Sequence, residues 1–390
     1  MSVSSELAPE TAAPPAPTVA FELPPRWVGW LHVTPFYVAS IALALGLSVL
    51  LIQLTGNSPS STVTALYDGS LQSGASIGQT IDEATPLLLV ALGTIICTRA
   101  GIFNIGQEGQ LIIGAMFGAA VGLHAPDPGP LGLTLILITA AAGGAFWAGI
   151  AAVLRYWRNV DVVISTLLLT FVAFEVVTYA VNQPSILKET ARPGEITSPE
   201  SDQIREAVRL PRIGQYPDLN FGAGCFIAVV LALVVVVMIR RSRWGFRLRM
   251  LGLNRVVAHR AGVSERWTGG TALVLSGAFA GLAGGIMLTG TVFRIQAGFS
   301  NNVGNEGLLV ALVSQGSGLV AVPVSFFFGA LRSGGGFLAT TGVPRYLVDV
   351  VQALLVLAAV FPSVYRARRR LRRASSAATP PSQMRQATAA

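Results

Sequence analysis

The chain has 390 residues, of which 52% are hydrophobic and only 12% are charged, with a formal net charge of +8. This composition, with a mean hydropathy of +0.61, excludes an ordinary soluble domain and indicates an all-α polytopic membrane protein. Residues 1–25 are rich in Pro and Ala, and residues 366–390 are first basic and then polar. We expect both to be disordered cytoplasmic tails, which leaves residues 26–365 for the transmembrane domain.

Apolar segments that approach bilayer length recur along the chain. A helix needs about 20 mostly apolar residues to cross roughly 30 Å of hydrocarbon. We therefore expect about ten transmembrane helices, some of them short or broken by glycine, with an external loop at 182–220 and a cytoplasmic loop at 240–267. The candidate spans are residues 36–54, 81–98, 108–123, 131–154, 162–181, 221–239, 268–293, 307–319, 320–341 and 346–361.

The loop at 240–267 is the most strongly charged internal segment. It reads RRSRWGFRLRMLGLNRVVAHRAGVSERW, with many arginines against the single acid Glu265. If the amino terminus is cytoplasmic and the spans alternate, most of the 27 lysines and arginines fall on the cytoplasmic side, as the positive-inside rule requires. The basic charge is then explained by membrane topology, and we expect no nucleic-acid partner. Both termini are expected in the cytoplasm.

The residue types argue against catalysis within this chain. Lys188, the only lysine, lies in SILKET without a preceding glycine-rich loop, so the chain lacks a P-loop for ATP. The histidines are scattered and the two cysteines lie in apolar runs, so no metal site and no nucleophile–base arrangement is indicated. We expect no catalytic residues, no metal and no cofactor of its own. The residues in question are His32, His124, His259, Cys97 and Cys225.

A polar segment, RAGIFNIGQEGQL, lies between two apolar runs at residues 99–111. Such a segment cannot form an ordinary lipid-facing helix. Either it is non-helical backbone at membrane depth, buried or lining a wet cavity, or it is a tight cytoplasmic turn with polar caps. Because Arg99 is expected at the cytoplasmic end, the polar residues are candidates for an inner gate or for the substrate pathway. They are Asn104, Gln107, Glu108 and Gln110.

Two charged residues, Glu175 and Arg332, lie in the middle of predicted spans. Ionisable groups at that depth usually face the interior of a bundle or an aqueous path. Arg332 therefore joins the candidates for the pathway or gate, and a structural buried ion pair is the alternative. Gly277, Gly281 and Gly285 recur every four residues in the span 268–293, a spacing that favours close helix packing.

Three motifs together resemble a known family. They are RAGIFNIGQEGQL, the loop sequence GLNRVVAHRAGV and, near the carboxyl end, GVPRYLVDVVQALLVL. In this order they are similar to the permease subunits of bacterial ABC importers for simple sugars and nucleosides. The chain most resembles the longer permease of nucleoside uptake systems that are served by a basic-membrane-protein-type binding lipoprotein. The resemblance covers roughly residues 80–362.

The resemblance implies partners and a coupling segment. It implies a multi-pass permease in the bacterial inner membrane, paired with a second permease subunit, with an ATP-binding subunit that holds ATP and Mg, and with an extracytoplasmic substrate-binding lipoprotein. It also implies a short coupling helix that docks on the ATPase. Asn254 suits the N-cap of that helix, and Gly262 suits its carboxyl-terminal stop. The motif falls here on Gly252, Asn254, Ala258, Ala261 and Gly262.

The sequence therefore predicts a permease subunit of an ATP-driven importer, with a nucleoside as the substrate. A simple-sugar importer of the ribose or galactose type is the nearest alternative. A secondary transporter, which needs no ATPase, is an alternative of a different class, and a receptor or structural membrane protein is a third.

Overall fold

The computed structural model describes residues 58–340 except 125–128, 184–185 and 191–198, with scattered positions at 42–54 and 349–358. The predicted tails lie outside the described residues, as do most of the predicted spans at 36–54 and 346–361. The helices are α3 (Pro59–Ser70), α4 (Gly74–Arg99), α5 (Gln107–His124), α6 (Pro130–Arg158), α7 (Val162–Asn182), α8 (Gly224–Arg241), α9 (Arg243–Leu253), α10 (Arg255–Arg260), α11 (Glu265–Met287), α12 (Val303–Val313) and α13 (Gly318–Thr340). A 3-10 turn η1 (Glu206–Val208), a π-helical turn η2 (Leu288–Val292) and a hairpin of β1 (Arg212–Gly214) and β2 (Asn220–Gly222) complete the described elements.

The fold class predicted from the sequence is confirmed. Among the described residues, six helices are long and apolar enough to cross a membrane: α4, α6, α7, α8, α11 continued by η2, and α13. Helix α5 coincides with the predicted span 108–123 but begins with a polar turn. Helix α12 is a short apolar helix of 11 residues. The predicted cytoplasmic loop is itself helical and forms α9 and α10.

Polar residues mark where several of these helices begin. The Ser73 side chain accepts a hydrogen bond from Ser76 N at α4, and that of Asp161 accepts from Val163 N at α7. Ser242 and Ser264 cap α9 and α11 in the same way. These side chains satisfy backbone donors that the first turn leaves free, so the helix starts are encoded locally.

The core of the bundle is α4 and α11, with α6 packed closely against α11. A Cβ added to Gly281 would lie 2.2 Å from the carbonyl oxygen of Ala140 on α6. A Cβ on Gly277 would lie 2.4 Å from the carbonyl oxygen of Gly144, and one on Gly285 would lie 2.7 Å from Ala140 Cβ. All three glycines therefore face α6, and the absence of side chains lets the two backbones approach.

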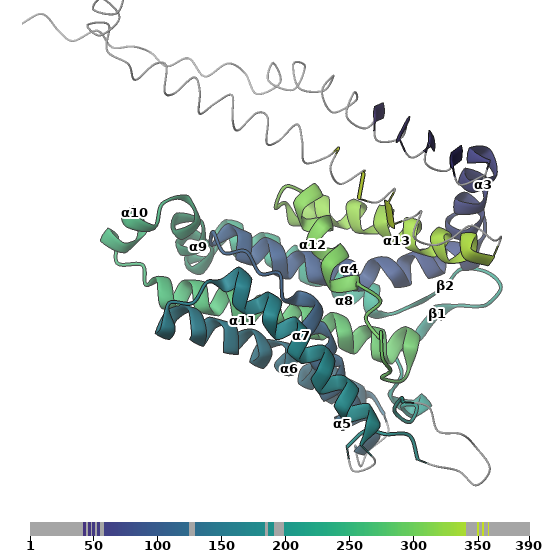
Figure 1. Ribbon diagram of the computed structural model, residues 1–390, viewed down its shortest axis with the longest axis horizontal. Coiled ribbons are helices and arrows are strands. Elements are labelled where there is room, and N and C mark those ends of the chain that lie inside the picture. Colours follow the sequence, from purple (N-terminus) through teal and green to yellow (C-terminus); the bar gives the residue numbers. More distant parts are fainter. Residues whose placement is uncertain are drawn as a thin grey trace, which may run out of the picture.

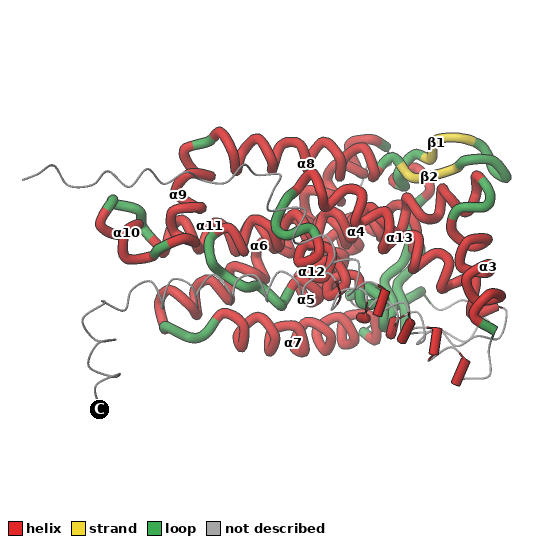
Figure 2. The backbone as a smooth tube through the Cα atoms, turned by 90° about the horizontal axis from the view of Figure 1, so that it is seen from above, coloured by secondary structure: helices red, strands yellow, loops and turns green. Residues whose placement is uncertain are grey.

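The bundle has two distinct ends (Figure 1). Helices α9 and α10 lie at one end, beside Arg99 and the ends of α6 and α8, and we call it the basic end. The β1–β2 hairpin lies at the other, the hairpin end, where Arg212 Nη2 donates to Asp82 Oδ2 at 2.9 Å and fastens the hairpin to α4. Seen from above, α7 and α8 lie at opposite edges of the bundle (Figure 2).

Candidate functional site

The polar segment predicted from the sequence turns back into the bundle. Helix α4 ends at Arg99, no helix is present at 100–106, and α5 begins at Gln107. Gln107 Nε2 donates to the carbonyl oxygen of Val90 at 3.2 Å, and Thr94 Oγ1 donates to Gln107 Oε1 at 2.6 Å. At a rise of 1.5 Å per residue, Val90 lies roughly 14 Å inside the basic end of α4. Of the two interpretations of this segment, buried non-helical backbone is the one that the structure contains.

The amide side chains of this segment form one buried network. Asn104 Nδ2 donates to Gln110 Oε1 at 2.9 Å and to Ser276 Oγ on α11 at 3.1 Å. Gln107 Nε2 also donates to Ser276 Oγ, at 2.8 Å. All four side chains are almost completely buried. A satisfied buried network holds its members in one geometry, so these residues position the first turn of α5 against α11. Their role in a pathway or gate stays a prediction.

Glu108 points away from that network, toward α12. Its Oε2 accepts hydrogen bonds from the backbone N–H of Gly304 at 2.6 Å and of Asn305 at 3.3 Å. Its Oε1 accepts from Ser300 Oγ. A carboxylate at a helix N-terminus satisfies free donors and complements the positive end of the helix dipole. Glu108 therefore caps α12 from another helix.

Arg332 joins three helices in the interior. Its Nε donates to Glu83 Oε2 on α4 at 2.8 Å, and its Nη1 donates to Glu306 Oε1 on α12 at 2.9 Å. The same Nη1 donates to the carbonyl oxygen of Asn301 at 3.1 Å. The expectation that Arg332 faces the interior holds, and its buried guanidinium pairs with the buried carboxylate of Glu306 and the partly exposed one of Glu83. Glu83 and Glu306 were missed as its partners, although each is an acid in or beside an apolar run.

Of the two positions expected for a mid-span charge, an interior face or an aqueous path, Glu175 does not take the interior one. It is exposed on α7 beside Phe171 and Phe174, which are also exposed. The physical reason is that α7 packs on α5 and α6 along one side only. Its opposite face is left uncovered by the described part of the chain.

The predicted coupling segment is a short capped helix at the basic end. Asn254 Oδ1 accepts from Val256 N at 3.0 Å and from Val257 N at 3.1 Å, and α10 follows. Gly262 follows the helix with a φ of +76°, a conformation that glycine adopts without steric cost. Ala258 is fully buried against the protein, whereas Ala261 and Gly262 are exposed. The segment therefore has an inner and an outer face.

The outer face of this segment carries apolar side chains that sequence reasoning did not select. Leu253 is 88% exposed, Val256 63% and Val257 53%. They stand out in the sequence as LNRVV within an arginine-rich stretch, which is the signal that could have identified them. Leu253 ends α9 and the two valines lie at the start of α10, and exposed apolar residues clustered in this way are typical of a docking surface.

The inner face of the same segment rests on the residues that lead into the buried polar segment. A Cβ on Gly252 would lie 2.3 Å from the carbonyl oxygen of Arg99, and one on Gly101 would lie 3.2 Å from Gly252 Cα. Arg255 Nη2 donates to the carbonyl oxygen of Gly101 at 3.4 Å. The two backbones are therefore in direct contact, without intervening side chains.

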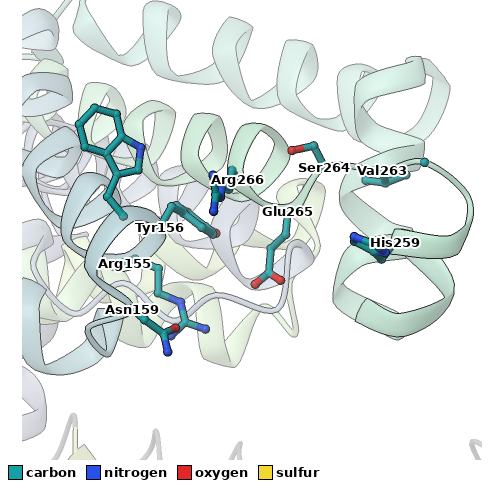
Figure 3. A pocket seen from close by; sticks show the side chains of 10 residues that line it. Arg155, Tyr156, Asn159, His259, Val263, Ser264, Glu265 and Arg266 are labelled. Carbon is teal, nitrogen blue, oxygen red and sulfur yellow. The ribbon is translucent and has the colours of Figure 1, made fainter.

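An open cleft of about 860 Å³ separates the end of α6 from α10 and the start of α11 (Figure 3). Arg155, Tyr156 and Asn159 line one side, and His259 lies on the other. Glu265 also lines the cleft and pairs with Arg255 at 3.6 Å. The exposed surface of the basic end therefore includes the end of α6 as well as α10 and the start of α11.

Comparison with known proteins assigns this arrangement to a family. Residues 76–360 match the family described as "Branched-chain amino acid transport system / permease component". The guanosine ABC transporter permease protein NupP of Bacillus subtilis is 33% identical over 324 residues, which cover 82% of this chain and 91% of that protein. The glucose ABC transporter permease protein TsgB13 of Haloferax volcanii is 32% identical over 351 residues, covering 87% and 90%. The nucleoside ABC transporter permease protein NupB of Lactococcus lactis is 27% identical over 329 residues, covering 82% and 89%.

Proposed function

Because the chain belongs to the family of branched-chain amino acid transport system permease components, we propose that it serves an ATP-driven importer whose substrate is a nucleoside. The relatives named for guanosine and for nucleosides support this substrate class. The relative named for glucose, which matches at 32% identity over most of both chains, supports a simple sugar as the second candidate.

The observation that carries the ATP-driven part of the proposal is the contact between the coupling segment and the backbone at Gly101. We place the basic end in the cytoplasm because its arginines fit the positive-inside rule. An ATP-binding subunit, which holds ATP and Mg, then docks on Leu253, Val256 and Val257 and in the adjoining cleft. Both termini are cytoplasmic in this arrangement, and the membrane is the bacterial inner membrane.

The contacts that lead inward from α10 suggest how ATP drives transport. Gly252 touches residues 99–101, the chain then enters the bundle, and α5 begins in the amide network. Glu108 in that first turn caps α12. Closure of the ATPase dimer moves α10, and the movement reaches the N-terminus of α12 through this continuous series of contacts. A second permease subunit completes the pathway, and an extracytoplasmic binding lipoprotein delivers the substrate at the hairpin end.

The test is uptake by the purified complex. The chain is isolated in mild detergent with its bound subunits, which mass spectrometry identifies, and the complex is reconstituted in proteoliposomes with the binding protein. We expect a P-loop ATPase among the subunits and ATP-dependent uptake of labelled guanosine that excess adenosine inhibits and glucose, ribose or galactose does not.

Two results would contradict the proposal at different levels. Uptake of glucose, but not of guanosine, would replace the nucleoside by a sugar and leave the ATP-driven mechanism in place. Uptake that follows an ion gradient without ATP, in a preparation that contains no ATPase, would assign a secondary transporter.

A further inference from the structure

Exposed amide side chains gather at the start of α12, in the middle of the bundle. Asn302 and Asn305 are both exposed, and Asn305 Nδ2 donates to Asn302 Oδ1 at 2.6 Å. A Cβ on Gly307, two residues after Asn305, would lie 2.5 Å from Val90 Cβ and 3.2 Å from the carbonyl oxygen of Leu87. Both residues lie near the middle of α4, which spans 26 residues. The exposed amides are therefore at mid-membrane depth.

At that depth an exposed amide does not face hydrocarbon without a large cost. The face of α12 that carries Asn302 and Asn305 therefore borders a wet cavity or a polar partner. Irregular backbone and a short helix that begins inside the bundle are tolerated in membrane proteins where they line such a cavity. Both are present here, because residues 293–302 are not helical and α12 has only 11 residues.

Glu306 provides an independent observation at the same turn. It is only 6% exposed, and its Oε1 accepts from Arg332 Nη1. Its Oε2 is buried and has no hydrogen-bond partner within the described part of the chain. A buried carboxylate oxygen without a donor is unfavourable and requires a ligand, a proton or a cation. Asn302 is the residue that precedes the helix and Glu306 directly follows Asn305, so the buried carboxylate belongs to the same first turn as the exposed amides.

We propose that the first turn of α12 is a substrate subsite, in which Asn302, Asn305 and Oε2 of Glu306 hydrogen-bond the hydroxyl groups of a sugar moiety. A hydroxyl donates to a carboxylate oxygen and both donates to and accepts from an amide. Guanosine and glucose, the substrates named for two relatives, both present such hydroxyls. The subsite rests on the proposed function, since it presupposes that a solute of this class crosses the bundle.

The charges around the turn also select against phosphorylated solutes. Among the described residues, Glu306 and Glu83 share the guanidinium of Arg332, and Glu108 lies at the N-terminus of α12. This surplus of carboxylates attracts hydroxyl donors and repels phosphate oxygens. The ligand is therefore a neutral nucleoside or sugar, not a nucleotide or a sugar phosphate.

The experiment compares substrates with and without hydroxyl groups in the reconstituted complex. Uptake of guanosine and of 2′,3′-dideoxyguanosine is measured at saturating binding protein for the wild type, Asn305→Ala and Glu306→Gln. The binding protein is the same for the wild type and both variants, so any preference that it has between the two substrates cancels when the variants are compared with the wild type. We expect kcat/KM for guanosine to fall about ten-fold in each variant, and that for the dideoxy analogue by less than about two-fold.

The matched control is Gln79→Ala, which removes an exposed amide from α4 outside this turn. We expect it to leave kcat/KM unchanged for both substrates. Equal losses for the two substrates would overturn the subsite and assign the turn a structural role. A sodium requirement that Glu306→Gln abolishes would also overturn it, in favour of a cation site. If the wild type transports glucose and not guanosine, the nucleoside proposal fails, and the same comparison between glucose and 2-deoxyglucose decides the subsite.

Discussion

The carboxylate of Glu108, in the first turn of α5, accepts a hydrogen bond of 2.6 Å from the backbone N–H of Gly304, in the first turn of α12. Two helix starts that lie 196 residues apart in the sequence therefore meet inside the bundle, with one carboxylate at the junction. The start of α5 is also tied to α11 through Ser276. The junction thus links the segment that enters the bundle from the basic end to the turn that carries the proposed subsite.

Removing the Glu108 carboxylate is expected to loosen the first turn of α12. Glu108→Ala eliminates the acceptor for Gly304 N and Asn305 N and should cost about 1–2 kcal/mol of local stability. The measurement is hydrogen exchange of a peptide that covers residues 300–306, which should become faster. Glu108→Gln, which keeps an acceptor oxygen but loses the charge, should give an intermediate rate. Unchanged exchange in Glu108→Ala would show that the cap contributes nothing.

Removing the Arg332 guanidinium is expected to destabilise the whole bundle. Arg332→Met leaves two carboxylates near each other without a counter-ion, and breaking a buried pair in this way costs about 3–5 kcal/mol. Most of the cost should come from Glu306, whose side chain is 8% exposed against 34% for Glu83. Thermal unfolding in detergent measures the effect. The double variant Arg332→Met with Glu306→Gln should recover part of the loss, and failure to recover would show that the charge on Glu306 is not its source.

A charge on the outer face of α10 is expected to weaken docking of the ATP-binding subunit and so to lower uptake. Val257 is half exposed and contributes to the apolar turn, so Val257→Asp should weaken docking of the ATPase and lower uptake roughly ten-fold or more. Val257→Ala, which removes two methyl groups and adds no charge, should retain most of the uptake. Both are measured by the amount of ATPase that co-purifies and by uptake in proteoliposomes. Normal co-purification with Val257→Asp would exclude this turn from the interface.

The contact between α6 and α11 is expected to tolerate no side chain at Gly281. Gly281→Ala places a Cβ 2.2 Å from the carbonyl oxygen of Ala140, so the helices must separate at a cost of about 1–3 kcal/mol. Gly270, on the same helix, is the control because the nearest atoms to an added Cβ belong to Tyr156, at 3.8 Å. Gly270→Ala should be neutral or slightly stabilising in thermal unfolding. Equal effects of the two substitutions would argue against close packing at Gly281.

Features that depend on short stretches of sequence were predictable. Asn254 was identified as an N-cap because capping involves a side chain and the next three residues, and its bonds to Val256 N and Val257 N are present. The orientation of Gly277 and Gly281 toward another helix follows from their four-residue spacing. Ala258 was selected as part of a docking helix, but the six residues of α10 are too few to show by periodicity that it faces inward.

The partners of Arg332 and the cap of α12 depend on residues far apart in the chain. Arg332 and Glu83 are separated by 249 positions, and no local pattern pairs them. The exposure of Glu175 was also not predictable, since the sequence around a mid-span charge does not reveal which face of its helix a neighbouring helix covers.

The sequence alone determined that this protein is a helical membrane protein with a capped basic-end helix, because hydropathy, charge asymmetry and capping are encoded in consecutive residues, and its three motifs carried the resemblance to the permeases. Only the tertiary structure decided that α5 begins deep inside the bundle, that Glu108 caps α12 and that Asn302, Asn305 and Glu306 share one turn at mid-depth. These relationships arise from how the helices pack, and packing brings together residues that the chain itself keeps far apart.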